Sequence, residues 1–383
     1  MHTRLAAELG LEFPIFAFTH CRDVAAAVSK AGGLGVLGVA GHSLDNLRME
    51  LDWIEHEVGD KPYGVDLLLP ARFVGSDRGG LDAADLDARI PDAHRRFLED
   101  LLARHGVPPL PQGTDVGSEF SVGYEKQREV IELVFGRRIS LIASALGPPP
   151  PWMIEQGRER GIKVAALAGT VEHARRHVQA GADIVVAQGT EAGGHTGEIS
   201  TMVLVPEVVD AVSPVPVLAA GGIGNGRQIA AALALGAQGV WMGSAWLTTE
   251  EAETHPVVKE KFLAARSSDT VRSRSITGKP ARMLRSAWTD AWDDPANPHP
   301  LPMPLQPRLV REAQVRIARS AHKSRGAADL ANYFVGQIVG SLQQVKSVRS
   351  FMQELIQEYA DTMERLDEWA EGGAVVREDA RKL

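Results

Sequence analysis

The apolar positions of this chain fall into eight short runs, and most segments between the runs have the spacing of amphipathic helices. The runs begin at Pro14, Gly33, Tyr63, Arg138, Ile162, Asp183, Val215 and Gln238. Nearly continuous apolar strands that alternate with helices indicate a parallel sheet covered by helices. Eight such units predict an α/β fold, the (β/α)8 or TIM barrel, with a doubly wound open sheet as the alternative.

Two polar stretches interrupt this rhythm and predict insertions. Residues 71–117 are rich in Gly, Asp and Pro, and residues 250–307 are irregular. Segments that follow strands lie at the C-terminal face of a barrel, where active sites are built. We therefore expect barrel strands and helices over residues 1–249, which include the first insertion, and a lid over the barrel mouth formed by residues 250–307.

Residues 308–383 predict C-terminal helices that include the last barrel helix. The segment DLANYFVGQIVGSL, which begins at Asp329, has an apolar stripe and is expected to be that helix. The segment VRSFMQELIQEYADTMERLDEWA, which begins at Val348, is amphipathic and charged. It predicts a helical extension that lies on the surface or contacts another subunit.

Composition narrows the range of partners. The formal net charge is −8 and the Lys and Arg residues are dispersed, which argues against nucleic acid or an anionic membrane as a partner. No run approaches the roughly 18 apolar residues of a membrane span, and the first residues lack a signal-peptide core. Cys21 is the only cysteine, so no intrachain disulfide can form, and we expect a cytoplasmic protein.

Small residues after two consecutive strands predict a phosphate site. They are Gly221, Gly222, Gly224 and Gly226 after the seventh strand, and Gly243 and Ser244 after the eighth. Glycines let backbone N–H groups approach an anion, and the helix that follows adds a favourable field. Barrels often bind phosphate after these two strands, although ordinary turn glycines are the alternative. The spacing matches neither GxGxxG nor the P-loop.

A histidine follows the sixth strand on a flexible loop, in the run VAQGTEAGGHTGEIS. Gly193, Gly194 and Gly197 flank His195 and let the backbone pass close to a bound ring. Histidine titrates near neutral pH, so we expect His195 to act as a general acid or base. A structural histidine that satisfies a loop carbonyl is the alternative. Glu191 is expected either to orient His195 or to cap the next helix.

Five other histidine and basic residues are further candidates. His20 follows the first strand and is expected to contact either the cofactor or substrate, or to start the next helix. Lys279 and Arg282 flank a Pro in the second insertion and could meet an anionic substrate or a CoA phosphate, with plain surface charge as the alternative. His173 and His177 lie four residues apart on a helix without an HExxH motif, so we expect a solvated face and no metal.

Three segments together resemble the nitronate monooxygenases, formerly called 2-nitropropane dioxygenases. They are AQGTEAGGHTG at 187–197, PVLAAGGIGNGRQIAAALALGAQGVWMGS at 216–244 and SITGKPAR at 275–282. The resemblance implies a TIM barrel that binds FMN. The same superfamily includes FMN-dependent enoyl-thioester reductases and flavin enzymes that act on CoA thioesters, so the resemblance implies the cofactor more firmly than the substrate.

The resemblance also implies roles for individual residues. Gln188 would bond the isoalloxazine ring, and Gly193 and Gly194 would pack close to it. Backbone groups of Ala17 and Phe18 would add contacts, although the PIFAFTHCR stretch departs from the family pattern. The phosphate would be held by Gly221, Gly222, Gly243 and Ser244, with Met242 nearby.

Asp66 occupies a place where the family commonly has an asparagine that contacts the flavin. A carboxylate there would disfavour the anionic reduced flavin, unless the carboxylate is protonated or turned away. This departure weakens the inference about substrate and leaves FMN as the expected cofactor.

We therefore expect an FMN-dependent oxidoreductase that oxidises nitronates or nitroalkanes with O2, with His195 as the general acid or base. The alternative is an FMN-dependent reductase or dehydrogenase that acts on an enoyl- or acyl-CoA thioester with NAD(P)H. A non-catalytic flavin-binding protein is a third reading. In each enzymatic case the partner is a small molecule, and a homodimer is the candidate assembly.

Overall fold

The computed structural model describes residues 1–114, 116 and 124–380, and its centre is a closed barrel of eight parallel strands. The strands are β1 (Ile15–Thr19), β2 (Leu34–Gly38), β3 (Tyr63–Leu68), β4 (Leu141–Ala145), β5 (Lys163–Ala168), β6 (Ile184–Gln188), β8 (Val217–Ala220) and β9 (Gly239–Met242). Because β1 pairs with both β2 and β9, the sheet closes. The predicted TIM barrel is confirmed, and the open-sheet alternative is wrong.

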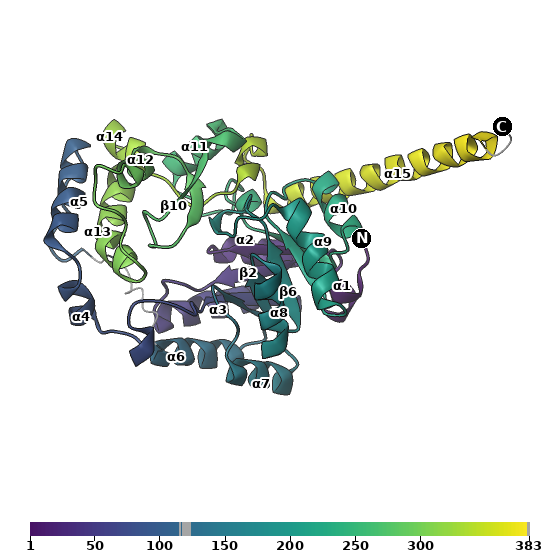
Figure 1. Cartoon of the computed structure of the whole chain (residues 1–383), viewed down its shortest axis with the longest axis horizontal. Coiled ribbons are helices and arrows are strands. Elements are labelled where there is room, and N and C mark those ends of the chain that lie inside the picture. The colour runs from purple at the N-terminus through teal and green to yellow at the C-terminus, as the bar shows by residue number, and fades with distance from the viewer. Residues whose placement is uncertain (115, 117–123, 381–383) are drawn as a thin grey trace.

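Helices surround the barrel after most of its strands (Figure 1). They are α2 (Arg22–Lys30), α3 (Leu44–Val58), α6 (Tyr124–Phe135), α7 (Pro151–Arg160), α8 (Val171–Ala180), α9 (Thr201–Val212), α10 (Gly226–Ala234) and α15 (Val348–Ala380), with α1 (Arg4–Glu8) before β1. Successive strand residues point alternately outward and into the lumen, so each strand contributes to an outer core and an inner core. Ile15 and Val240 pack outward against the helices, whereas Phe16 and Trp241 fill the lumen with their rings stacked 6.4 Å apart.

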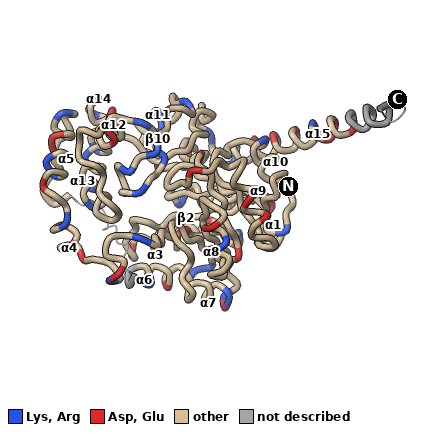
Figure 2. The backbone as a smooth tube through the Cα atoms, viewed as in Figure 1, with Lys and Arg blue, Asp and Glu red and all other residues tan. Residues whose placement is uncertain are grey.

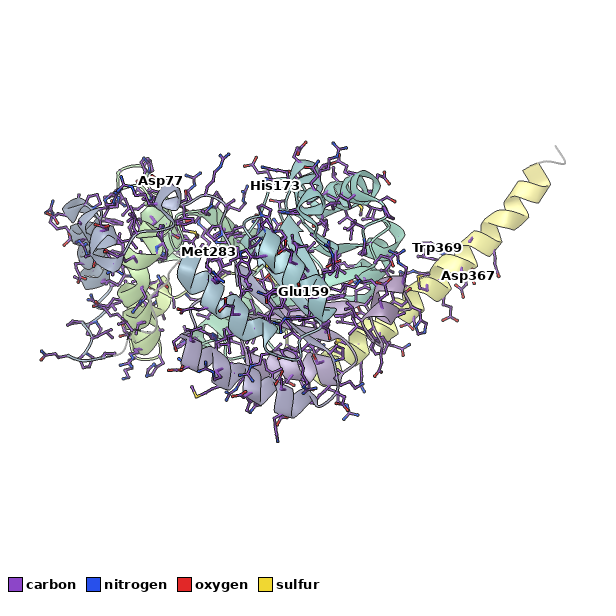
Figure 3. All side chains as sticks on the ribbon, turned by 90° about the horizontal axis from the view of Figure 1, so that it is seen from below. Asp77, Glu159, His173, Met283, Asp367 and Trp369 are labelled. Carbon is purple, nitrogen blue, oxygen red and sulfur yellow. The ribbon has the colours of Figure 1, made fainter. Side chains whose placement is uncertain are left out.

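The last barrel helix is α15, and the prediction that it lies at residues 329–342 is wrong. The first part of α15 packs against α10 and α2, with Met352 and Leu355 in the outer core. The two helices are so close that a Cβ on Gly226 would lie 2.2 Å from the Tyr359 nitrogen. The second part of α15 projects beyond the barrel, and Trp369 on it is 65% exposed (Figures 1 and 3).

Residues 329–342 are apolar for a different reason. After α14 (Arg325–Leu330) the chain is extended, with Leu284 N donating to Tyr333 O at 3.1 Å, and then forms a short 3-10 turn. Its apolar side chains, among them Val335 and Val339, are buried in a second core. The apolar spacing therefore reflects burial between two parts of the protein and not a helix face.

That second core belongs to a lobe beside the barrel, formed by two segments far apart in the sequence. Its helices are α4 (Ala83–Ala88), α5 (Asp92–Arg104), α11 (Pro256–Ala264), α12 (Ala287–Asp293), α13 (Leu305–Ser320) and α14. Phe97 of α5 meets Trp292 of α12 edge to face at 4.9 Å, and Arg316 Nη1 pairs with Glu99 at 2.8 Å. Figure 1 shows α4 and α5 beside α13, so the two insertions form one body.

A small antiparallel sheet joins the lobe to the barrel mouth. It consists of β10 (Thr270–Ser273), β11 (Ala281–Leu284) and the two-residue β7 (Gly194–His195), in the order β10-β11-β7. Ala281 pairs with His195 and Arg282 with Gly194. The lobe therefore fixes the loop that follows β6.

The surface shows no strong separation of charge. Basic and acidic residues alternate along most elements in Figure 2. Among the described helices, none is long and apolar enough to cross a membrane.

Candidate active site

The candidate site is the barrel mouth, where the C-terminal ends of the strands meet the loops that follow them. Tyr63, Val65 and Leu67 of β3 pack outward against the surrounding helices. Because strand side chains alternate, Asp66 faces the lumen. By the same alternation on β6, Gln188 follows the inward residues Ile184 and Val186. Two polar side chains thus top an otherwise apolar lumen.

Asp66 is buried without a compensating partner. Its side chain belongs to a residue that is 6% exposed, and its Oδ2 atom has no hydrogen-bond partner among the described residues. Its strand neighbours are Gly38 of β2 and Ala143 of β4, neither of which has a polar side chain. Burial raises the pKa of the Asp66 carboxyl well above its usual range.

Gln188 ends β6 opposite Ala220 of β8. Its side chain is half-buried, and within the described part of the chain its amide makes no hydrogen bond. An amide offers both donors and an acceptor, so Gln188 and Asp66 supply free polar groups at the same end of the barrel.

Free backbone donors lie at two adjacent strand ends. Ala220 of β8 pairs with Trp241 of β9, so the residues that follow, Gly222 and Ser244 among them, stand side by side. Neither the Gly222 N–H nor the Ser244 N–H donates to any residue that the structure describes. Gly222 has φ +70°, and Gly221 has φ +104°, conformations that favour glycine. Such paired donors suit a phosphate.

Two N–H groups at the N-terminus of α10, in contrast, donate to protein side chains. The Gly226 N–H donates to Glu358 of α15 at 2.9 Å, and the Gly224 N–H donates to Gln228 Oε1 at 2.8 Å. The expected contribution of Gly224 and Gly226 to an anion site is therefore wrong. The N–H groups of Gly222 and Ser244, at the ends of β8 and β9, have no such acceptor among the described residues.

His195 is fixed at one ring nitrogen and free at the other. Its Nδ1 lies 3.2 Å from the Pro280 carbonyl oxygen, which selects the tautomer with hydrogen on Nδ1. Burial, with a smaller contribution from the Lys279 charge, lowers the pKa of His195 to about 4. The expectation of near-neutral titration is thus wrong: at neutral pH the ring is uncharged and Nε2 has an available lone pair.

Glu191 caps the next helix. Its carboxylate accepts hydrogen bonds from the Thr201 N–H at 2.9 Å and the Thr201 hydroxyl at 2.8 Å, at the first turn of α9. This favours the capping alternative over an orienting role toward His195. The Thr201 hydroxyl also lies 3.0 Å from Gly221 O, so the cap supports the glycine loop that follows β8.

The glycines beside His195 differ in what they require. A Cβ on Gly193 would lie 2.8 Å from Gly336 N and 2.9 Å from the Ser244 hydroxyl, so a tightly packed chain segment fills that space. Gly194 has φ +75° and an open Cβ direction. Ser244 also accepts a hydrogen bond from the Gly336 N–H at 2.8 Å. The Gly193 position is therefore set by protein packing at Gly336.

Only one of the two predicted cations is available. Arg282 is buried and donates to Thr190 O at 2.8 Å and to the Thr270 hydroxyl at 3.1 Å, so it holds the loop in place. The Lys279 ammonium makes no hydrogen bond or ion pair with described residues. Its pKa is lowered by burial and by the nearby charge of Arg72. The Lys279 charge thus acts on His195, and Arg72 is a second cation close to Lys279.

The N-terminal candidates divide between the outer core and the lumen. Ala17 and Met242 pair across β1 and β9, and both are buried in the outer core. Phe18 faces the lumen, stacked 6.3 Å from Trp241. His20 is exposed to solvent, with Nδ1 2.9 Å from Gly38 O, and burial by surrounding protein lowers its pKa. The ring therefore lies against Gly38 at the end of β2.

The aromatic pair Tyr333 and Phe334 was not anticipated from the sequence. The Phe334 ring centroid lies 6.4 Å from that of His195, and 5.5 Å from that of Tyr333. Tyr333 is 37% exposed, yet burial raises the pKa of its hydroxyl. Their segment looked helical in the sequence, so only its aromatic content signalled a site.

The expected solvated face holds for His173, which is exposed, and is wrong for His177 on the same helix (Figure 3). His177 is buried, with Nε2 3.0 Å from Leu167 O. His177 therefore links α8 to β5.

Comparison with known proteins places this geometry in context. The family model described as Nitronate monooxygenase matches residues 5–358. A Mycobacterium tuberculosis protein named as a monooxygenase is 59% identical over 369 residues, which cover 96% of this chain and 98% of that protein. A Staphylococcus saprophyticus protein named as a nitronate monooxygenase is 34% identical, over 82% of this chain and 88% of its own. The solved nitroalkane oxidase of Streptomyces ansochromogenes is 26% identical, with a TM-score of 0.77 over 94% of this chain and 99% of that chain.

Proposed function

The chain belongs to the nitronate monooxygenase family of oxidoreductases, and from this membership we propose that it is an FMN-dependent enzyme that oxidises nitronates or nitroalkanes. The observation that carries the proposal is the coincidence of two features at one barrel mouth. Free N–H groups of Gly222 and Ser244 suit a phosphate, and unpartnered Asp66 and Gln188 suit a polar ring.

FMN fits the residues that are present. The Gly222 and Ser244 N–H groups would hold its phosphate, and Gly221 gives the loop its left-handed turn. Asp66 and Gln188 would face its ring. When bound, FMN would supply the redox chemistry, taking electrons from the substrate and passing them to oxygen.

His195 would handle the substrate proton. Pro280 holds the ring at Nδ1, so Nε2 is the atom that would accept a proton from the carbon next to the nitro group. Lys279 would attract the anionic group, since its ammonium is free and half-buried. Tyr333 and Phe334 would shield the reacting atoms from water.

The first test is a visible spectrum followed by turnover. The purified protein should carry a yellow chromophore that is released as FMN on denaturation. With propionate-3-nitronate or 2-nitropropane it should consume oxygen and release nitrite. His195→Asn should lower kcat/KM by about 10²–10⁴-fold while it keeps FMN. A colourless protein that takes up no FMN, or holo-protein inert toward both substrates, would overturn the proposal.

A second candidate activity is reduction or dehydrogenation of an acyl-CoA thioester. The observation that favours it is the presence of Arg72 as a second cation close to Lys279, because a CoA group carries several negative charges and a nitronate carries one. In that case NAD(P)H should bleach the flavin anaerobically, and an enoyl-CoA should restore its colour. If neither NADH nor NADPH bleaches the flavin, the nitronate reaction is the better supported activity.

A further inference from the structure

We propose that Asp66 is a neutral carboxylic acid in the folded protein and that its O–H donates a hydrogen bond to the ring of the bound cofactor. The second half of this inference rests on the proposed function. A neutral carboxylic acid at this position offers a donor and an acceptor, as an amide would.

The surroundings of Asp66 cannot support a negative charge. Its Oδ2 atom is buried and unpartnered, and the flanking strands contribute Gly38 and Ala143 at its level. The lumen next to these residues is apolar, with Val36 and Leu141 among its members. An isolated ionised carboxylate in such a setting carries a large desolvation cost, whereas the neutral acid does not.

No charged group of the described residues compensates that cost. On the neighbouring strand ends the titratable side chain is His20, and its Nδ1 is occupied by Gly38 O. Charge on Asp66 itself is opposed by burial alone, with no neighbouring cation to favour it.

Protonation changes what Asp66 can do. An ionised carboxylate only accepts hydrogen bonds, but a carboxylic acid has one donor and retains an acceptor, as an amide does. A buried acid kept neutral at pH 7 so that it can donate is established enzyme chemistry. A neutral donor accommodates electron density that builds on a ring, whereas a fixed negative charge opposes it.

Infrared spectroscopy tests the protonation state directly, with or without cofactor. The difference spectrum of wild type minus Asp66→Asn at pH 7 should show the carbonyl band of a protonated carboxylic acid, which shifts on ¹³C-aspartate labelling. Asp183→Asn is the matched control, because Asp183 is an exposed carboxyl that accepts from Val164 N–H. That variant should leave the band unchanged. Carboxylate bands alone in the Asp66 difference would overturn the inference.

Adding FMN then tests the contact. The acid band should move to lower frequency on FMN binding, and an unmoved band in FMN-loaded protein would overturn the donation. The midpoint potential of bound FMN should be similar in wild type and Asp66→Asn at pH 7. A much lower wild-type potential would show an ionised Asp66. If no FMN binds, the proposed function fails, and the band in the cofactor-free protein still decides whether Asp66 is neutral.

Discussion

The carbonyl oxygen of Pro280 lies 3.2 Å from Nδ1 of His195, and the pairing of Ala281 with His195 holds both in register. The lobe, which is built from two distant insertions, therefore determines that the hydrogen of the neutral His195 ring is on Nδ1. Because the Pro280 carbonyl oxygen accepts a hydrogen bond from Nδ1–H, the lone pair of the ring is on Nε2.

The pH dependence of the reaction should follow from this environment. The pKa of His195 is about 4, and the active form is the neutral one, so activity is lost as pH falls through that value. We expect kcat/KM for a neutral nitroalkane, whose carbon must lose a proton, to be flat from about pH 6 to 7 and to fall about tenfold per unit below pH 4. His195→Asn should remove this limb. A limb near pH 6.5 that depends on His195 would contradict the assignment.

Asp66 should make the cofactor-free protein less stable at neutral pH than its amide variant. The folded-state pKa is raised, so the unfolded chain releases this proton first as pH increases. The contribution of Asp66 to stability is complete below its unfolded pKa and is lost as pH rises through the folded one. Asp66→Asn should therefore raise the Tm at pH 7, with a gain that shrinks toward pH 4. A gain that does not vary with pH would contradict this.

The phosphate loop should tolerate no side chain at Gly222. Its φ is +70°, and a Cβ would lie 3.2 Å from the Glu191 Cβ, so Gly222→Ala should weaken FMN binding about tenfold or more. Gly106→Ala is the matched control, since Gly106 has φ +63° with open space around its Cβ. The control should lose stability and keep the FMN dissociation constant. Equal FMN affinity in both variants would argue against a phosphate site here.

Glu191 should matter for stability more than for proton transfer. Removing its hydrogen bonds to Thr201 in Glu191→Ala should lower the free energy of unfolding by about 1–2 kcal/mol. Glu191→Gln keeps an acceptor and should recover part of the loss. Because Pro280, and not Glu191, holds the His195 ring, the acid limb of the pH profile should not move in either variant. A shifted limb in Glu191→Gln would restore the orienting role.

The barrel strands were predictable because each is a short apolar run buried on both faces. Gly33–Gly38 in the sequence and Leu34–Gly38 in the structure illustrate the agreement. The position of His195 at the mouth followed from its place after the sixth strand. Its low pKa did not, because burial by the lobe and the charge of Lys279 come from residues more than 80 positions away.

The sequence also could not show that Asp66 lacks a hydrogen-bond partner, or that a side chain of α15 accepts from the N-terminus of α10. Glu358, which accepts from the Gly226 N–H, is 132 residues distant. Local spacing shows that a helix has an apolar face, but it does not show what covers that face. The same limit explains why residues 329–342 looked like the last barrel helix and the segment after Val348 looked like a surface helix.

The role of α15 as a barrel helix makes a last prediction. Leu355 is 1% exposed and packs in the outer core, so Leu355→Ala should lower the free energy of unfolding by about 2–5 kcal/mol. Leu366 lies on the same helix and is 43% exposed, so Leu366→Ala should change it by no more than about 0.5 kcal/mol. Chemical denaturation of the two variants measures the contrast. Equal, small effects would mean that α15 only lies on the surface, whereas the expected difference requires its first turns to close the barrel between α10 and α2.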